Sequence, residues 1–164
     1  MGMFKIIYGD LITLALNGHF DVIGHGCNCF CTMGAGIAVQ MKNVFECDKY
    51  PLEHKSRYGD INKLGQIDYL GRNYTKDSNI FELIIINCYT QYHYGKNHVT
   101  GTIKPIDYEA LTLCLRKINH VFAGKRVGLP AIGAGLAGGD LEVIKEIMKR
   151  ELDDCDVTLV LYNG

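Results

Sequence analysis

Apolar residues along the chain recur in two spacings, and each spacing predicts one kind of element. Helical spacing occurs in three segments, which predict helices over 34–45, from Pro105 to 122, and over 141–152. The unbroken apolar run LIII within FELIIINCY (81–89) predicts a strand buried on both faces. Weaker strand patterns cover 3–9, 21–26, 65–71, 125–132 and 156–162, and short helical segments are predicted in LITLALNG and around 48–58.

Strands and helices alternate along the chain without a repeat, a low-complexity tract or a linker. This alternation predicts one α/β domain over 1–164, with about six strands in a largely buried sheet and helices on both of its faces. In such sheets, ligands bind beyond the carboxyl ends of the strands. Two glycine-rich runs, MGAGIA (33–38) and GAGLAGG (133–139), fall at such ends and are the first candidates for a binding site.

Composition and charge limit the kinds of binding partner and the cellular compartment that we expect for this protein. The net charge is −1 over 164 residues, so we expect no strong direct binding to nucleic acid. No apolar stretch approaches the ~20 residues that span a bilayer, and the N-terminal sequence lacks the pattern of a signal peptide. The seven cysteines are an odd number in a chain with ample apolar residues, which favours reduced thiols in a cytoplasmic protein over a disulfide scaffold.

Three of these cysteines alternate in HGCNCFCTMGAGIA (25–38), at positions 27, 29 and 31. Structural zinc sites usually need a second, distant pair of ligands, and redox pairs use C-x-x-C. Here the other four cysteines are isolated, and C-x-x-C is absent. Cysteine is a small and often buried residue, so core packing is the favoured interpretation, with metal or redox use as the alternatives.

The run GAGLAG (133–138) matches the dinucleotide fingerprint G-x-G-x-x-G between a predicted strand and a predicted helix. That fingerprint normally needs an acidic residue ~20 residues later, where this chain has Leu161 and Tyr162. A nicotinamide-dependent oxidoreductase is therefore disfavoured. Backbone N–H groups in such a loop can still bind a phosphate, and a mere tight turn is the alternative. MGAGIA lacks the G-K-[ST] of a nucleotide-hydrolysing loop, so hydrolysis of a nucleoside triphosphate is disfavoured. Two glycine loops that meet at one edge of a sheet can hold a diphosphate from both sides, and the two runs together predict such a site.

His25 and Asn28 lie between a strand and the first glycine run, next to the predicted diphosphate. A histidine there can act as a general acid or base near pH 7, and an asparagine can orient a sugar hydroxyl or a water. Both can instead satisfy backbone groups of a loop, as buried polar side chains often do. His93 and His98, in the polar loop 91–104, are predicted to be exposed to solvent, with a lid role as the alternative.

Three segments resemble those of a known family and follow one another in the same order along the chain. They are Gly9-Asp10-Leu11 after the first strand, GHGCN...MGAGIA, and LPAIGAGL before the helix at 141–152. Together they resemble the macro domain, the ADP-ribose-binding α/β module, over essentially the whole chain. HGCNCFCTMGAGIA is most similar to the branch of the fungal ADP-ribose 1″-phosphate phosphatase, the terminal ADP-ribose protein glycohydrolase and the bacterial antitoxins that remove ADP-ribose from DNA. The resemblance implies a three-layer α/β/α fold with a central mixed sheet.

The resemblance also implies which residues hold ADP-ribose. Asp10 would accept the adenine amino group, with Leu11 beside the base and Tyr162 packed against it. Asn28 falls where the family contacts the distal ribose, and His25 matches a histidine of the phosphatase-like members. The two diphosphate loops would consist of Gly34, Ala35, Gly36 and Ile37, and of Ala131, Ile132, Gly133, Ala134, Gly135, Leu136 and Ala137.

Two departures from the family bear on the reaction. In the glycohydrolase branch a catalytic lysine follows the threonine that corresponds to Thr90, and here Gln91 cannot act as an amine nucleophile. The human glycohydrolase also uses an aspartate just after G-x-G-L, where this chain has Ala137. Both departures argue against covalent removal of ADP-ribose from macromolecules.

The first hypothesis is therefore a phosphatase that hydrolyses ADP-ribose 1″-phosphate to ADP-ribose and phosphate, with His25 and Asn28 as its catalytic residues. No constellation of carboxylates indicates a bound Mg²⁺, so we expect turnover without a metal or a cofactor. The alternatives are a non-catalytic ADP-ribose reader and a hydrolase that removes ADP-ribose from protein or nucleic acid.

Overall fold

The computed structural model describes residues 2–34, 36–49, 59–97, 99–135 and 137–162. Six strands form one mixed sheet in the order β1-β6-β5-β2-β4-β3, and among them β3 alone is antiparallel to its neighbour. The strands are β1 (Phe4–Tyr8), β2 (Val22–Asn28), β3 (Ile67–Lys76), β4 (Asn79–Gln91), β5 (Arg126–Leu129) and β6 (Asp156–Leu161). The described helices are α1 (Leu11–Leu16), α2 (Ile37–Phe45), α4 (Tyr108–Val121) and α5 (Leu141–Glu151), with 3₁₀ turns at Cys47–Lys49 and Ile61–Lys63.

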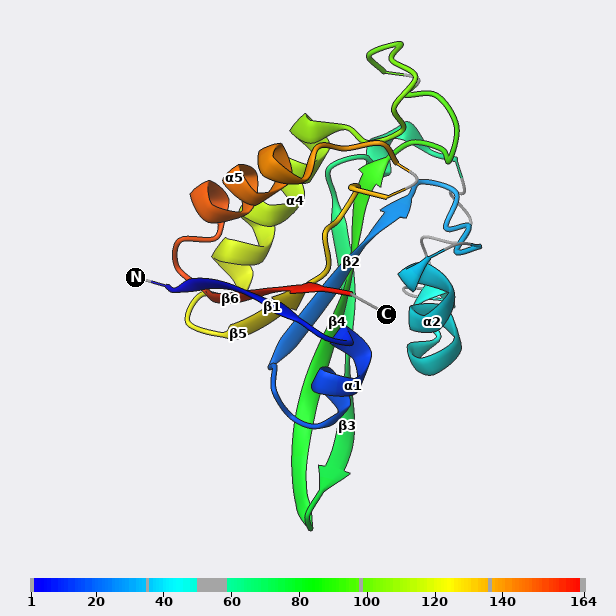
Figure 1. Cartoon of the computed structure of the whole chain (residues 1–164). Helices are drawn as coiled ribbons and strands as arrows, with labels where there is room; N and C mark the ends of the chain where they lie inside the picture. Colours follow the sequence, from blue (N-terminus) through cyan, green and yellow to red (C-terminus); the bar gives the residue numbers. More distant parts are fainter. Residues whose placement is uncertain (1, 35, 50–58, 98, 136, 163–164) are drawn as a thin grey trace.

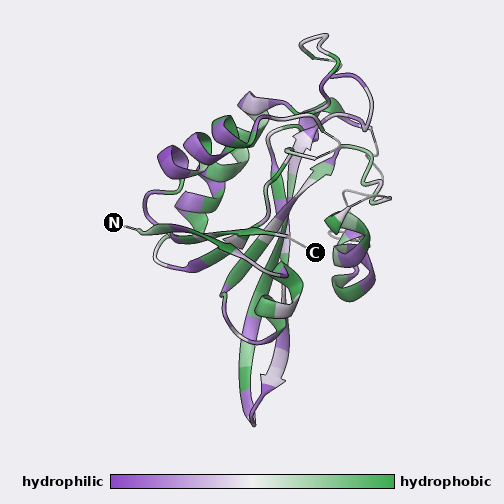
Figure 2. Cartoon of the chain, viewed as in Figure 1, coloured by the Kyte–Doolittle hydropathy of each residue, from purple (hydrophilic) through white to green (hydrophobic). Residues whose placement is uncertain are grey.

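Helices cover both faces of the sheet, so the molecule has three layers (Figure 1). One core cluster lies between the sheet and the helices α4 and α5, with Leu115 and Ile144 among its fully buried members. A second cluster lies on the opposite face, where α1 and α2 contribute Ala15 and Met41. Figure 2 shows the matching pattern, in which α4 and α5 turn polar residues outward. The α/β fold with a mixed six-stranded sheet, predicted from the sequence, is confirmed.

Strand β4 occupies the interior position that its apolar run predicts. Leu83, Ile85 and Ile86 are completely buried, because β2 and β3 flank the strand and helices cover both faces. Its first residues pair with the end of β3 in a hairpin that extends beyond the helices (Figure 1). The sequence predicted that β3 ends at residue 71, because RNYTK (72–76) carries no apolar pattern, whereas cross-strand pairing continues it to Lys76.

Element boundaries differ from the predictions where a cap or turn intervenes. α4 begins at Tyr108 instead of Pro105, because the Asp107 carboxylate accepts a hydrogen bond from the Ala110 N–H at 3.0 Å and caps the helix there. α2 begins only at Ile37, and β5 ends at Leu129. The predicted segment around 48–58 lies mostly outside the described residues, because 50–58 are not among them.

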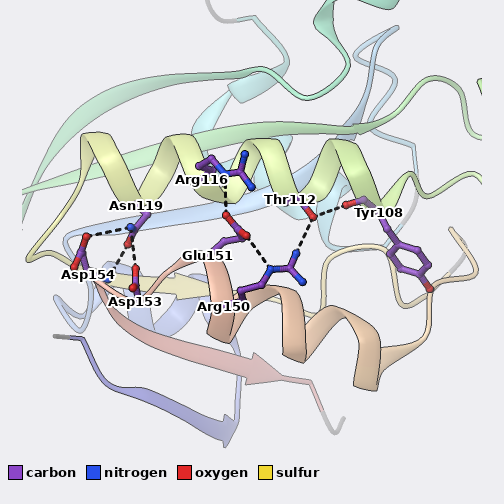
Figure 3. A network of polar contacts seen from close by, with 8 residues as sticks. All are labelled: Tyr108, Thr112, Arg116, Asn119, Arg150, Glu151, Asp153 and Asp154. Atoms are coloured by element: carbon purple, nitrogen blue, oxygen red, sulfur yellow. Dashed lines mark hydrogen bonds and ion pairs between the residues drawn. The ribbon is translucent and has the colours of Figure 1, made fainter.

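Polar contacts join the exposed sides of α4 and α5 (Figure 3). Glu151 accepts hydrogen bonds from Arg116 at 3.0 Å and from Arg150 at 2.9 Å. Asn119 of α4 donates to Asp153 and Asp154, which follow α5. These pairs are exposed to solvent, and each stabilises the fold by only about 0–1 kcal/mol. The packing of α4 and α5 on the sheet therefore depends mainly on the buried cluster.

Candidate functional site

The carboxyl ends of all five parallel strands meet at one edge of the sheet. The chain leaves β1 into Gly9, β2 at Asn28, β4 at Gln91, β5 into Pro130 and β6 into Tyr162, and each of these residues lines a cavity. Open α/β sheets bind ligands at this edge, because the loops that follow neighbouring strands can turn to opposite faces of the sheet and leave a crevice between them. The fold therefore assembles the site from segments distant in the sequence.

Two neighbouring cavities occupy this edge, with volumes of about 410 and 640 Å³. They share Gly36, Ile37, Pro130 and Ala131 as lining residues, so they form one cleft with two compartments. Gly36 and Ile37 come from the first glycine-rich run, and Pro130 and Ala131 lie just before the second. The waist of the cleft is therefore made largely of backbone and small side chains.

The smaller compartment lies between α1, the start of α2 and the end of β6. The Asp10 carboxylate accepts a hydrogen bond from the Thr13 N–H at 3.0 Å, so it caps α1 while also lining the cavity. Leu11 forms part of the apolar wall, and Tyr162 is 73% exposed at the rim. An open apolar slot with one carboxylate at its edge suits a flat heteroaromatic ring that carries an amino group.

The larger compartment is lined by uncharged residues throughout the described part of the chain. Its polar groups come from Asn28, Thr32, Gln91 and Tyr94, together with backbone of both glycine segments. Its lining residues are Gly26, Cys27, Asn28, Thr32, Met33, Gly34, Gly36, Ile37, Ala38, Gln91, Tyr94, Pro130, Ala131, Ile132, Gly133, Gly135 and Ala137.

Glycines in the larger compartment, beside the waist, leave space that no other part of the described protein fills. A Cβ added at Gly34 or at Gly135 would meet no heavy atom within 4 Å. Gly36 has φ 59° and precedes α2, whose first turn has no side-chain cap. The N–H groups of Ile37 and Ala38 thus belong to an uncapped helix start that lines the larger cavity, and such a start favours an anion.

Asn28 holds the loop that forms one wall of the larger compartment. Its Oδ1 accepts hydrogen bonds from the Phe30 and Thr32 N–H groups at 3.0 and 3.2 Å, and its Nδ2 donates to the Thr32 carbonyl at 3.0 Å. The amide nitrogen carries two hydrogens, so one donor remains for a ligand. Asn28 therefore satisfies its loop and also lines the cavity, and its contact with a sugar stays a prediction.

His25 lies in the core, and its predicted role as an acid or base in the cleft does not fit this position. The ring is completely buried and does not line either cavity. Its Nε2 lies 2.8 Å from Asn87 Oδ1, and the Cys27 and Cys47 sulfurs lie 3.5 Å from the same nitrogen. Burial lowers the pKa of His25 to about 4, although the Asn87 hydrogen bond opposes this shift. The side chain is therefore neutral near pH 7.

The alternating cysteines of the motif are mainly packing residues. Cys27 and Cys29 belong to the core cluster under α1 and α2, and Cys31 is half-buried. Burial raises the pKa of the Cys29 thiol to about 12, so it stays protonated. Within the described residues, no group of three or more His, Cys, Asp or Glu side chains is arranged to hold a metal ion.

Among the described helices, none combines the length and the apolar composition that a membrane span requires.

The structure brings together most of the residues singled out from the sequence. Ala35 and Leu136 lie outside the described residues, and Ala134 packs against the core without lining a cavity. The predicted residues that line the cleft are Asp10, Leu11, Asn28, Gly34, Gly36, Ile37, Ala131, Ile132, Gly133, Gly135, Ala137 and Tyr162.

Several lining residues had no signal in the sequence. Gln40 reaches the smaller cavity one turn into α2, and Val160 forms its floor on β6. Tyr94 lines the larger cavity from the loop that sequence reasoning associated only with its histidines. His98 of that loop lies outside the described residues, and His93 is half-buried.

The fold that carries this cleft has counterparts in solved structures. A protein of unknown function from Bacteroides thetaiotaomicron matches with TM-score 0.74 and 26% identity over 98% of both chains. The macrodomain of Thermus aquaticus DarG matches with TM-score 0.70 and 20% identity over 100% of both chains. Thermosipho africanus DarTG, solved in complex with ADP-ribose, matches with TM-score 0.72 and 16% identity, over 98% of this chain and 42% of that one.

The fold is that of a macrodomain. At the level of sequence, the chain is 32% identical to an uncharacterized 17.5 kDa protein from the tk-vs intergenic region of Enterobacteria phage T4, over 95% of this chain and 94% of that protein. No protein-family model matches the sequence.

Proposed function

We propose that the cleft binds ADP-ribose and that the protein hydrolyses ADP-ribose 1″-phosphate to ADP-ribose and phosphate. The observation that carries the binding proposal is the division of one cleft into two compartments at a waist made by Gly36, Ile37, Pro130 and Ala131. ADP-ribose likewise consists of two bulky ends joined by a diphosphate. DarTG, which shares this fold, was solved with that ligand.

The waist offers the diphosphate hydrogen-bond donors without a cationic side chain. The uncapped start of α2 presents N–H groups and the positive end of the helix dipole. The open positions at Gly34 and Gly135 let phosphate oxygens approach the backbone of both loops. These contacts are shared by ADP-ribose and its 1″-phosphate, so they provide binding but do not by themselves accelerate a reaction.

The smaller compartment receives the adenine ring. Asp10 uses one carboxylate oxygen to cap α1, and the remaining acceptor positions can take the adenine amino group. Leu11 and Tyr162 pack against the faces and edge of the base. Inosine-containing analogues, which have a carbonyl in place of that amino group, would therefore bind more weakly.

The larger compartment receives the distal ribose and its phosphate. Asn28 lines this space and has one amide N–H left to donate to the sugar, and Thr32 and Gln91 add further polar groups. Hydrolysis then depends on donors that stabilise the charge on the departing phosphate and on water held in place beside the sugar. His25 has no part in this scheme, because its ring is enclosed by the core.

The test of binding is calorimetry with ADP-ribose on two matched valine variants. Gly135→Val adds a side chain in the larger compartment, beside the waist, where no neighbouring atom hinders folding of the variant. Gly95→Val makes the same change in open space outside the cavity lining. Loss of ADP-ribose binding in Gly135→Val, with retention in Gly95→Val, is the expected result; equal affinities in both variants would exclude this cleft as the site.

The test of hydrolysis is phosphate release from ADP-ribose 1″-phosphate in the presence of a chelator. Asn28→Asp keeps the oxygen that accepts from Phe30 and Thr32 but removes both amide donors, one of which holds the Thr32 carbonyl, so we expect a loss of turnover. An unchanged unfolding temperature would show that the loss does not come from a destabilised fold. Binding without phosphate release would leave a reader of ADP-ribose. A parallel incubation with ADP-ribosylated protein and DNA detects the third possibility, removal of ADP-ribose from macromolecules.

A further inference from the structure

An aromatic cluster stands at the mouth of the larger compartment and takes no part in the scheme above. Phe30 lies edge-on to Tyr92 and His93, with ring centroids 5.2 and 4.6 Å away. The His93 ring lies 3.8 Å from the Tyr94 ring at an interplanar angle of 39°. Tyr94 is 68% exposed and lines the cavity, so a large apolar ring faces solvent at the entrance.

The backbone that carries Tyr94 is held in place on both sides. Gln91 Nε2 donates to the His93 carbonyl at 3.1 Å, and the Cys29 N–H donates to the Tyr92 carbonyl at 2.9 Å. Further along the loop, the buried Asn97 donates to the Ile106 carbonyl at 3.1 Å and accepts from two N–H groups of its own turn. A ring on a backbone fixed in this way loses little conformational freedom when a ligand contacts it.

The cluster also connects Tyr94 with the residue proposed to contact the distal ribose. Phe30 packs against His93 and donates its backbone N–H to Asn28 Oδ1 at 3.0 Å. The loop of Asn28 and the loop of Tyr94 therefore form two sides of one compartment and brace each other. A sugar between them would meet a hydrogen-bond donor on one side and an aromatic face on the other.

We propose that Tyr94 is a specificity-determining residue that packs its ring on the distal ribose and so distinguishes ADP-ribose from ADP. This inference rests on the proposed function, because it assigns the larger compartment to the distal sugar. The uncharged lining of that compartment, among the described residues, agrees with recognition of a neutral sugar by packing and hydrogen bonds. Removal of the ring loses apolar contact with the sugar and admits water to its exposed face.

The experiment compares two ligands across three variants by calorimetry. Tyr94→Ala is expected to weaken ADP-ribose by about 3- to 10-fold and to leave ADP within about twofold, because ADP has no distal ribose. Tyr94→Phe keeps the ring and should retain the affinity of the unaltered protein for both ligands. Tyr162→Ala, at the adenine end, should weaken ADP and ADP-ribose by the same factor.

Each result decides a different question. A Tyr94→Ala variant that binds ADP-ribose as tightly as the unaltered protein, or that loses affinity for both ligands equally, would overturn the role of Tyr94 alone. Failure of the unaltered protein to bind ADP-ribose would overturn the proposed function and this inference with it. Because Tyr94 is exposed, the variants are expected to fold, and an unchanged unfolding temperature confirms it.

Discussion

The buried His25 makes the stability of this protein depend on pH in a way that can be calculated. Its pKa is about 4 in the folded protein and 6.5 in the unfolded chain, so the unfolded state binds the proton more readily. The neutral ring therefore stabilises the fold above pH 6.5, and this stability is lost as the pH falls toward 4. The expected loss of unfolding free energy from this one group is about 1 kcal/mol at pH 6, about 2 at pH 5 and about 3 at pH 4.

The measurement is urea unfolding of the unaltered protein and of His25→Gln at pH 7, 6, 5 and 4.5. Carboxylates also titrate over this range, but they do so in both proteins, so the difference between the two slopes isolates the histidine. The unaltered protein should lose stability more steeply than the variant as the pH falls. Parallel curves would mean that His25 is not held neutral in the fold. The argument that excludes His25 from the catalytic residues would then be weakened.

Three further predictions concern the caps, the thiols and the packing under β5. Asp10→Asn should keep the cap on α1 whereas Asp10→Ala should lower the unfolding free energy by about 1 kcal/mol, and both should weaken ADP-ribose in calorimetry. Iodoacetamide on the native protein, followed by peptide mass spectrometry, should modify the half-buried Cys31 well before Cys29, whose thiol is buried and protonated. Gly128→Ala would place a Cβ 2.7 Å from the Phe20 ring and should lower the free energy of unfolding in urea by about 1–3 kcal/mol. An unchanged free energy of unfolding would mean that the Phe20 ring can shift without loss.

The sequence predicted the arrangement of the fold well, because apolar spacing reports directly on burial. Most of the apolar run in β4 and of the apolar stripes in α4 and α5 is fully buried, including Ile86, Leu115 and Ile144. Boundaries were less predictable where short polar side chains decide them. Asp107 caps α4 two residues beyond Pro105, and no periodicity in the sequence distinguishes the two positions.

For the site, glycine spacing was the informative signal, because glycine marks backbone that a ligand can approach. It predicted Gly36 at the waist of the cleft and Gly135 in the larger compartment. The position predicted for His25 is wrong because a linear sequence does not show which face of a strand a side chain occupies. His25 and Asn28 are three residues apart on β2, and the first points into the core while the second ends the strand at the cavity. Tyr94 was missed because its loop has no periodicity.

The β3–β4 hairpin ends in the turn Asp77-Ser78, where both residues have positive φ. This turn lies at the end of the molecule opposite the carboxyl ends of β2 and β4 (Figure 1), and no residue of β3 lines either cavity. Exposed hairpin tips tolerate insertions, because few contacts depend on them. The tip is therefore a suitable place for a fluorophore or an affinity tag, which would attach the protein to a surface with its cleft facing away and open to ligand.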